Sequence, residues 1–79
     1  MTLNEALSIR IDELLAEKGI TQYRLAIKSG LSSEAISKIR LQKNKMCAIN
    51  IIYEIAQGFD MTLEEFFSGS LFSKENITD

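Results

Sequence analysis

The chain has 79 residues, 46% of them hydrophobic and 25% charged, with a net charge of −2. Because a chain of this length can bury only one hydrophobic core, we expect a single domain with the composition of a soluble protein. It has no histidine, a single cysteine and no glycine-rich phosphate loop, so we predict no metal site, no cofactor, no catalytic residue and therefore no enzyme.

The first predicted element is a helix that begins near Leu3 or Asn4 and ends at Lys18, before Gly19. Three- and four-residue spacing gives it an apolar face of Leu3, Leu7, Ile11, Leu14 and Leu15. The segment is acidic and amphipathic, unlike a signal peptide. The uncharged run Met46–Tyr53 falls far short of the ~20 residues of a membrane helix. We therefore expect a cytoplasmic protein without a membrane span.

A second helix is predicted over Gln22–Ser29, with Thr21 as its N-cap. Its inward residues are expected to be Leu25 and Ala26. Gly30 should end this helix, because glycine tolerates the left-handed backbone found at helix C-termini. The next helix then starts at an angle to it.

Ser32 is expected to cap a third helix that runs to about Leu41. At 100° per residue, Ile36 and Ile39 fall on one side and form a narrow inward seam. The opposite face carries short polar side chains and one lysine, namely Ser33, Glu34, Ser37 and Lys38. Such a slim face suits the DNA major groove, where lysine donates to guanine, a carboxylate accepts from cytosine and serine serves either base. We predict that these four residues contact bases.

Positive charge is concentrated in the middle of the chain. Residues 21–46 carry six basic side chains and one acidic side chain, a local charge of +5, whereas residues 1–20 carry −2 and residues 47–79 carry −5. This asymmetry is typical of a surface that binds phosphate. A helix N-terminus directed at a phosphate adds to it. We expect phosphate contacts from Thr21, Gln22, Ser32, Arg40, Lys43, Asn44 and Lys45.

A polar connection leads into a fourth helix, roughly Ala48–Gly58, and a capping box at residues 62–65 opens a short fifth helix through Phe67. The apolar face of the fourth helix is expected to comprise Ile49, Ile52, Tyr53, Ile55 and Ala56. Cys47 should be a small buried or half-buried hydrophobe. We expect a domain over residues 3–68 and a loosely held tail over 69–79, which is polar apart from Leu71, Phe72 and Ile77.

The spacing T-Q-x-x-L-A-x-x-x-G-L-S-x-x-x-I-S-x-I, which begins at Thr21, resembles the helix-turn-helix of the lambda-repressor-like (Xre/Cro) DNA-binding domains. The resemblance covers about residues 3–67. It implies an all-α fold, a compact five-helix bundle, that binds double-stranded operator-like DNA as a homodimer. It also implies a transcriptional regulator of bacterial or phage type, and we expect a repressor. By this similarity the segment 32–41 enters the major groove, with Gln22 and Ser32 at phosphate-contacting positions.

Some residues depart from the family pattern. The family usually ends its third helix with an acidic residue, which pairs with an arginine of the first helix, and then a glycine. Here Arg40 and Gln42 occupy those places, so Arg10 faces another cation. Either Arg10 pairs elsewhere, with Glu13 or Glu54, or Arg40 turns out towards phosphate. Before the fourth helix, the segment 46–48 lacks the usual capping Ser or Thr.

A second interpretation stays open from the sequence. Ile9, Ile27 and Leu41 are apolar where the family pattern is usually polar; together with Phe72 and Ile77 they would mark a dimer face or a docking site for the tail. The alternative function is a protein-interaction module, or an antitoxin-type partner, that retains the fold. The acidic total charge favours this alternative, whereas the basic middle segment and the slim third helix favour DNA binding. No small-molecule site is evident.

Overall fold

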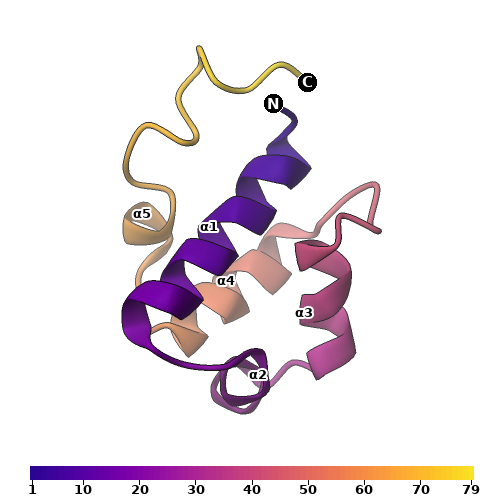
Figure 1. Ribbon diagram of the computed structural model, residues 1–79, viewed down its shortest axis with the longest axis vertical. Helices are drawn as coiled ribbons and strands as arrows, with labels where there is room; N and C mark the ends of the chain where they lie inside the picture. Colours follow the sequence, from indigo (N-terminus) through magenta and orange to yellow (C-terminus); the bar gives the residue numbers. More distant parts are fainter.

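The computed structural model describes residues 1–79, which form five helices and no strand (Figure 1). The helices are α1 (Leu3–Lys18), α2 (Gln22–Ser29), α3 (Ser33–Arg40), α4 (Ile49–Gly58) and α5 (Leu63–Phe66). They pack into a body of 34 × 23 × 21 Å. The prediction of a compact all-α bundle is confirmed. None of these helices combines the length and the apolar character that crossing a bilayer requires.

The helix ends follow the local sequence. The N-caps Thr2, Thr21, Ser32 and Thr62 each accept a hydrogen bond from a backbone N–H one turn into their helix. Gly30 ends α2 with φ of 78°, the left-handed conformation that favours glycine. Ala48 provides no side-chain cap for α4, as its sequence predicts. The break between α2 and α3 therefore lies at Gly30, as the sequence predicts.

The core is one cluster to which every helix contributes. Its fully buried large side chains are Ile11, Leu14, Leu25, Ile36, Ile55, Phe59 and Phe66. Three residues expected on inward faces are instead exposed: Leu3 by 43%, Ile49 by 62% and Tyr53 by 46%. Leu3 and Ile49 are the first residues of α1 and α4, and Tyr53 lies one turn beyond Ile49 on the same outer row. The predicted apolar faces were therefore too wide at these points.

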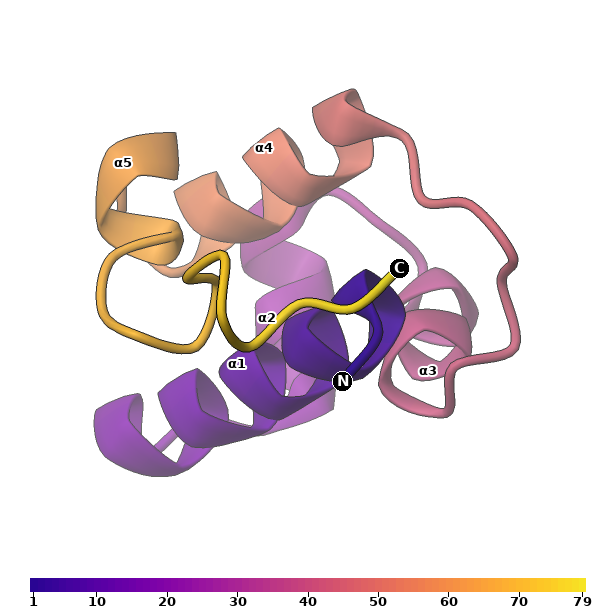
Figure 2. The ribbon, with the colours of Figure 1, turned by 90° about the horizontal axis from the view of Figure 1, so that it is seen from above.

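The C-terminal tail is held, and the expectation of a loose tail was wrong. The Phe72 ring packs edge-on against Phe67, with centroids 4.8 Å apart. The two ends of the chain are joined by hydrogen bonds from Met1 N to Asn76 O, from Thr78 N to Met1 O and from Leu3 N to Asp79 Oδ1. Figure 2 shows the tail lying along the start of α1. Phe72 thus docks on α5 and the segment after it.

Helices α2 and α4 approach closely at Gly58. A Cβ atom at this position would lie 2.9 Å from Leu25 Cδ1, 3.0 Å from Ser29 Cβ and 3.2 Å from Ser29 N. The backbone of Ser29 cannot move aside without shifting α2. Since α2 leads directly into α3, this contact helps to fix the direction of both helices.

We expect Gly58→Ala to lower the free energy of unfolding by about 1–2 kcal/mol. Overpacking in a tight core costs about 1–3 kcal/mol, and the better helix propensity of alanine recovers at most ~1 kcal/mol. Urea unfolding followed by circular dichroism measures the change. Asn50→Ala, at an exposed position of the same helix, is the matched control, and an unfolding free energy for Gly58→Ala equal to or above that of the natural chain would contradict the packing described.

Candidate nucleic-acid interface

Helix α3 is attached to the body through two side chains. Ile36 is 0% exposed and Ile39 is 5% exposed, and they are the buried residues of this helix. On the other side Ser33, Glu34 and Lys38 are exposed, whereas Ser37 is half-buried. The division into an isoleucine seam and a polar face, expected from helical spacing, is present in the structure, with Ser37 at its edge.

Glu34 and Lys38 pair with each other along this face. Lys38 Nζ lies 3.6 Å from Glu34 Oε1, one turn apart on the helix. Exposed pairs at this spacing contribute about 0.3–0.5 kcal/mol. The pair is weak enough for either side chain to turn to a base edge.

A hydrogen-bonded chain of side chains crosses α1, α2 and α3. Arg40 donates from Nε to Asp12 Oδ1 at 2.6 Å and from Nη1 to Gln22 Oε1 at 2.8 Å. Gln22 in turn donates from Nε2 to Ser33 O at 3.0 Å and to Ser33 Oγ at 2.9 Å. The start of α2 is thereby tied to both ends of α3. Arg40 is turned to α1 in this structure, so it does not adopt the second of the two alternatives left open by the sequence, in which it turns out towards phosphate.

Arg10 has a different partner from those expected. Its Nε donates to Phe66 O at 2.6 Å and its Nη2 donates to Glu65 O at 3.0 Å. These are carbonyl groups at the C-terminal end of α5, where a cation is favoured. Neither Glu13 nor Glu54 is involved. The two arginines therefore do not face each other, because Arg10 donates to carbonyl groups of α5, whereas Arg40 donates to side chains of α1 and α2.

Two polar residues of α1 that sequence reasoning missed hold the end of α3 and the loop after it. Ser8, which is buried, donates to Arg40 O at 2.6 Å. Asn4 donates from Nδ2 to Asn44 O at 2.9 Å and to Lys45 O at 3.3 Å. Asn4 and Ser8 are four residues apart and share one face of α1, which is the only signal in the sequence that could have identified them.

The cations of the basic segment differ in their partners. Lys28 pairs with Asp60 at 2.9 Å, and this hydrogen bond lowers the pKa of the Asp60 carboxyl below its usual value. Lys43 and Lys45, on the loop after α3, are exposed and form no ion pair. They are therefore basic side chains that no carboxylate of the protein neutralises.

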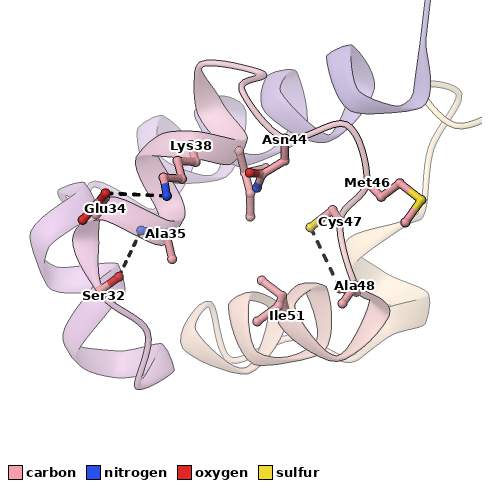
Figure 3. Close-up of a pocket in the computed structure, with 10 residues that line it drawn as sticks. Ser32, Glu34, Ala35, Lys38, Asn44, Met46, Cys47, Ala48 and Ile51 are labelled. Atoms are coloured by element: carbon pink, nitrogen blue, oxygen red, sulfur yellow. Dashed lines mark hydrogen bonds and ion pairs between the residues drawn. The ribbon is translucent and has the colours of Figure 1, made fainter.

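A hollow of about 380 Å³ lies between α3 and the segment that enters α4 (Figure 3). It is lined by Ser32, Glu34, Ala35, Lys38, Ile39, Asn44, Met46, Cys47, Ala48 and Ile51. Cys47 is half-buried in it, as expected, and burial raises the pKa of its thiol. Nothing in the sequence predicts this hollow, since it arises from the path of the loop. A smaller hollow of about 280 Å³ is lined by Asp12, Gln22, Ser37, Arg40 and Leu41.

Comparison with known proteins identifies the family. A family model described as the Cro/C1-type HTH DNA-binding domain matches residues 10–68. The chain belongs to this family. The resemblance inferred from the sequence is confirmed, and α2 and α3 are the helix-turn-helix of this Cro/C1-type domain. The protein is thus a DNA-binding regulator of the Cro/C1 type.

Solved structures of the restriction-modification controller protein C.Esp1396I are similar to this Cro/C1-type chain. A point mutant of that protein has 33% sequence identity and a TM-score of 0.76, over 85% of this chain and 86% of that chain. The same protein bound to a 25 base pair operator site has 31% identity and a TM-score of 0.75, over 85% and 87% of the two chains. A nucleoprotein complex of it matches 100% of this chain and 99% of that chain at 29% identity, with a TM-score of 0.79. The comparison with curated proteins found no match.

We expect the Cys47 thiol to react slowly with iodoacetamide at pH 8, because burial raises its pKa and the thiolate is the reactive form. Mass spectrometry measures the alkylation rate of the folded chain, and the same chain in concentrated urea provides the reference rate. Equal rates in the two conditions would contradict the position of Cys47 in the hollow.

Proposed function

We propose that this protein is a sequence-specific operator-binding regulator of bacterial or phage type that inserts α3 into the DNA major groove. The observation that carries the proposal is the burial of Ile36 and Ile39, which leaves the polar side of α3 exposed beside the cations of the following loop. The operator-bound structure of the similar controller protein supports it. We propose that it acts in the cytoplasm as a repressor, by binding an operator that overlaps a promoter.

The base contacts in this proposal come from Ser33, Glu34, Ser37 and Lys38. Lys38 would donate to guanine O6 and N7, and Glu34 would accept from the amino group of cytosine. Ser33 lies in the first turn of α3, the part of a recognition helix that reaches base edges. Ser37 is half-buried, so it is the least accessible of these four side chains.

The phosphate contacts in this proposal surround α3. They come from Thr21, Gln22, Ser32, Arg40, Lys43, Asn44 and Lys45. The N-termini of α2 and α3 present backbone N–H groups that suit an anion. Lys43 and Lys45 add positive charge on the loop after α3. Contacts of this kind fix the register of a protein on DNA and carry no sequence information.

We also propose that the protein acts as a homodimer, because helix-turn-helix dimers read two half-sites of a symmetric operator. Ile49 and Tyr53 form an exposed apolar row on α4, and Met46, just before α4, is 86% exposed. The same exposed row is the observation that favours the second candidate function, a protein-interaction module or antitoxin-type partner.

Salt dependence separates DNA binding from protein binding. Operator sequences are first selected with the natural chain from a random DNA pool. We expect the affinity for the selected duplex to fall with salt with a log–log slope near −0.9 for each phosphate contacted. A flat response, or no selected sequence, would contradict operator binding and favour the protein-interaction module.

Two lysines separate base contacts from phosphate contacts. We expect Lys38→Ala to weaken binding to the selected operator about tenfold but to change binding much less when the operator is altered at the base pair that Lys38 contacts, since a good base contact contributes about 1–3 kcal/mol of discrimination. Lys43→Ala should weaken binding to every duplex by the same factor. Fluorescence anisotropy with a set of single-base variants measures both. Equal losses across all duplexes in both mutants would contradict this division.

The dimer is tested by sedimentation equilibrium of the natural chain from low to high micromolar concentration. We expect Ile49→Asp to raise the dimer dissociation constant at least roughly tenfold, because it places a charge in an apolar contact. Tyr23→Asp, which changes a side chain of α2 that is 71% exposed and belongs to neither candidate dimer face, is the matched control and should leave the constant unchanged. A natural chain that stays monomeric at high micromolar concentration would contradict the homodimer.

A further inference from the structure

Asp12 is an acidic side chain within the set of groups assigned above to DNA phosphate. It accepts from Arg40 Nε at 2.6 Å, and the same guanidinium donates to Gln22 at 2.8 Å. Arg40 and Gln22 both belong to the proposed phosphate contacts, so the inference rests on the proposed function. The Asp12 side chain is 52% exposed and the Arg40 side chain is 33% exposed, so both members of the ion pair are accessible from solvent.

A carboxylate and a phosphate compete for the same donors. The guanidinium group is a planar fork whose N–H groups bind either anion, and charge-assisted pairs of this kind are the strong ones among hydrogen bonds. In the structure Arg40 Nε already donates to Asp12 and Arg40 Nη1 already donates to Gln22, so a phosphate bound to the remaining N–H groups would lie beside the Asp12 carboxylate. A phosphate that contacts Arg40 must therefore displace the Asp12 carboxylate or share the guanidinium with it at the cost of repulsion between two anions.

The space for such an exchange is present. The hollow of about 280 Å³ is lined by Asp12, Gln22, Ser37, Arg40 and Leu41, so it opens directly beside the ion pair. The hydroxyl group of Ser8, which is buried, donates to the backbone carbonyl oxygen of Arg40 and so holds the backbone at this position. The arginine side chain can therefore change partner without movement of α3.

We propose that Asp12 is a positioning residue that holds Arg40 in the free protein and releases it to a DNA phosphate, so that binding exchanges one ion pair for another. Asp12 then lowers the affinity for every duplex alike, because phosphate contacts are independent of sequence. The unpaired Lys43 and Lys45 act at the first encounter, and Arg40 joins the interface only when a phosphate lies close enough to compete. Asp12 thereby sets how readily the protein stays on unrelated DNA.

The test measures the affinity of Asp12→Asn for the selected operator and for an unrelated duplex. Asparagine has the same shape without the charge, so Arg40 is held less strongly. We expect binding to both duplexes to become tighter by the same factor, roughly two- to tenfold at about 0.1 M salt. Glu13→Gln removes one negative charge from the neighbouring position of α1 and measures the general effect of net charge. We expect its gain to be clearly smaller.

A double-mutant cycle identifies the cause. In an Arg40→Gln background the gain from Asp12→Asn should fall to the level of Glu13→Gln, because the residue that Asp12 holds is gone. If Arg40→Gln fails to fold by circular dichroism, Arg40→Met takes its place, since methionine keeps an apolar stem and carries no charge that Asp12 could hold.

Three results would overturn the inference while leaving the proposed function standing: a gain no larger than that of Glu13→Gln, a gain that persists without Arg40, or weaker binding by Asp12→Asn. Absence of salt-dependent DNA binding by the natural chain would overturn the proposed function and, with it, the inference.

Discussion

The burial of Ile36 and Ile39 is the constraint on which the interface depends. These two side chains fill the core side of α3, and no other residue of this helix is buried. Because they are three residues apart, they fix both the distance of the helix from the body and its rotation about its own axis. Ser33, Glu34 and Lys38 then point outward as a consequence. The left-handed Gly30 and the close approach of α4 to α2 at Gly58 set the direction in which the pair of helices leaves the body.

The net charge of −2 would repel DNA. Any attraction to DNA must therefore come from the local distribution of charged side chains around α3. Several cations of the basic segment are held by carboxylates in the free protein: Lys28 by Asp60, Lys38 by Glu34 and Arg40 by Asp12. Lys43 and Lys45 have no such partner. The unpaired cations of the basic segment are therefore Lys43 and Lys45 on the loop and Arg24, which is exposed on α2. In our proposal, the paired side chains become available to phosphate only at short range, so that tight binding depends on close contact.

Much of the fold follows from local patterns that act within one turn of a helix. Thr21, Gly30 and Ser32 mark the ends of α2 and the start of α3 through hydrogen bonds that involve only near neighbours, so the sequence predicts them well. The partners of Arg10 and Arg40 lie 18 to 56 residues away along the chain, and nothing in the spacing of residues distinguishes Asp12 or the α5 carbonyls from other acceptors. The position of the tail could not be predicted for the same reason. Phe72 lies in a mostly polar segment, and its contact with Phe67 depends on how the chain turns after α5.

The claim that α3 is the DNA-reading helix is tested most directly by nuclear magnetic resonance. A ¹⁵N-labelled natural chain is titrated with the selected duplex, and the change in each backbone amide signal is recorded. We expect the large changes at residues 21–22 and 32–45, with small changes along α5 and the tail. Large changes confined to α4, α5 or the tail, with the signals of α3 unmoved, would contradict the orientation described.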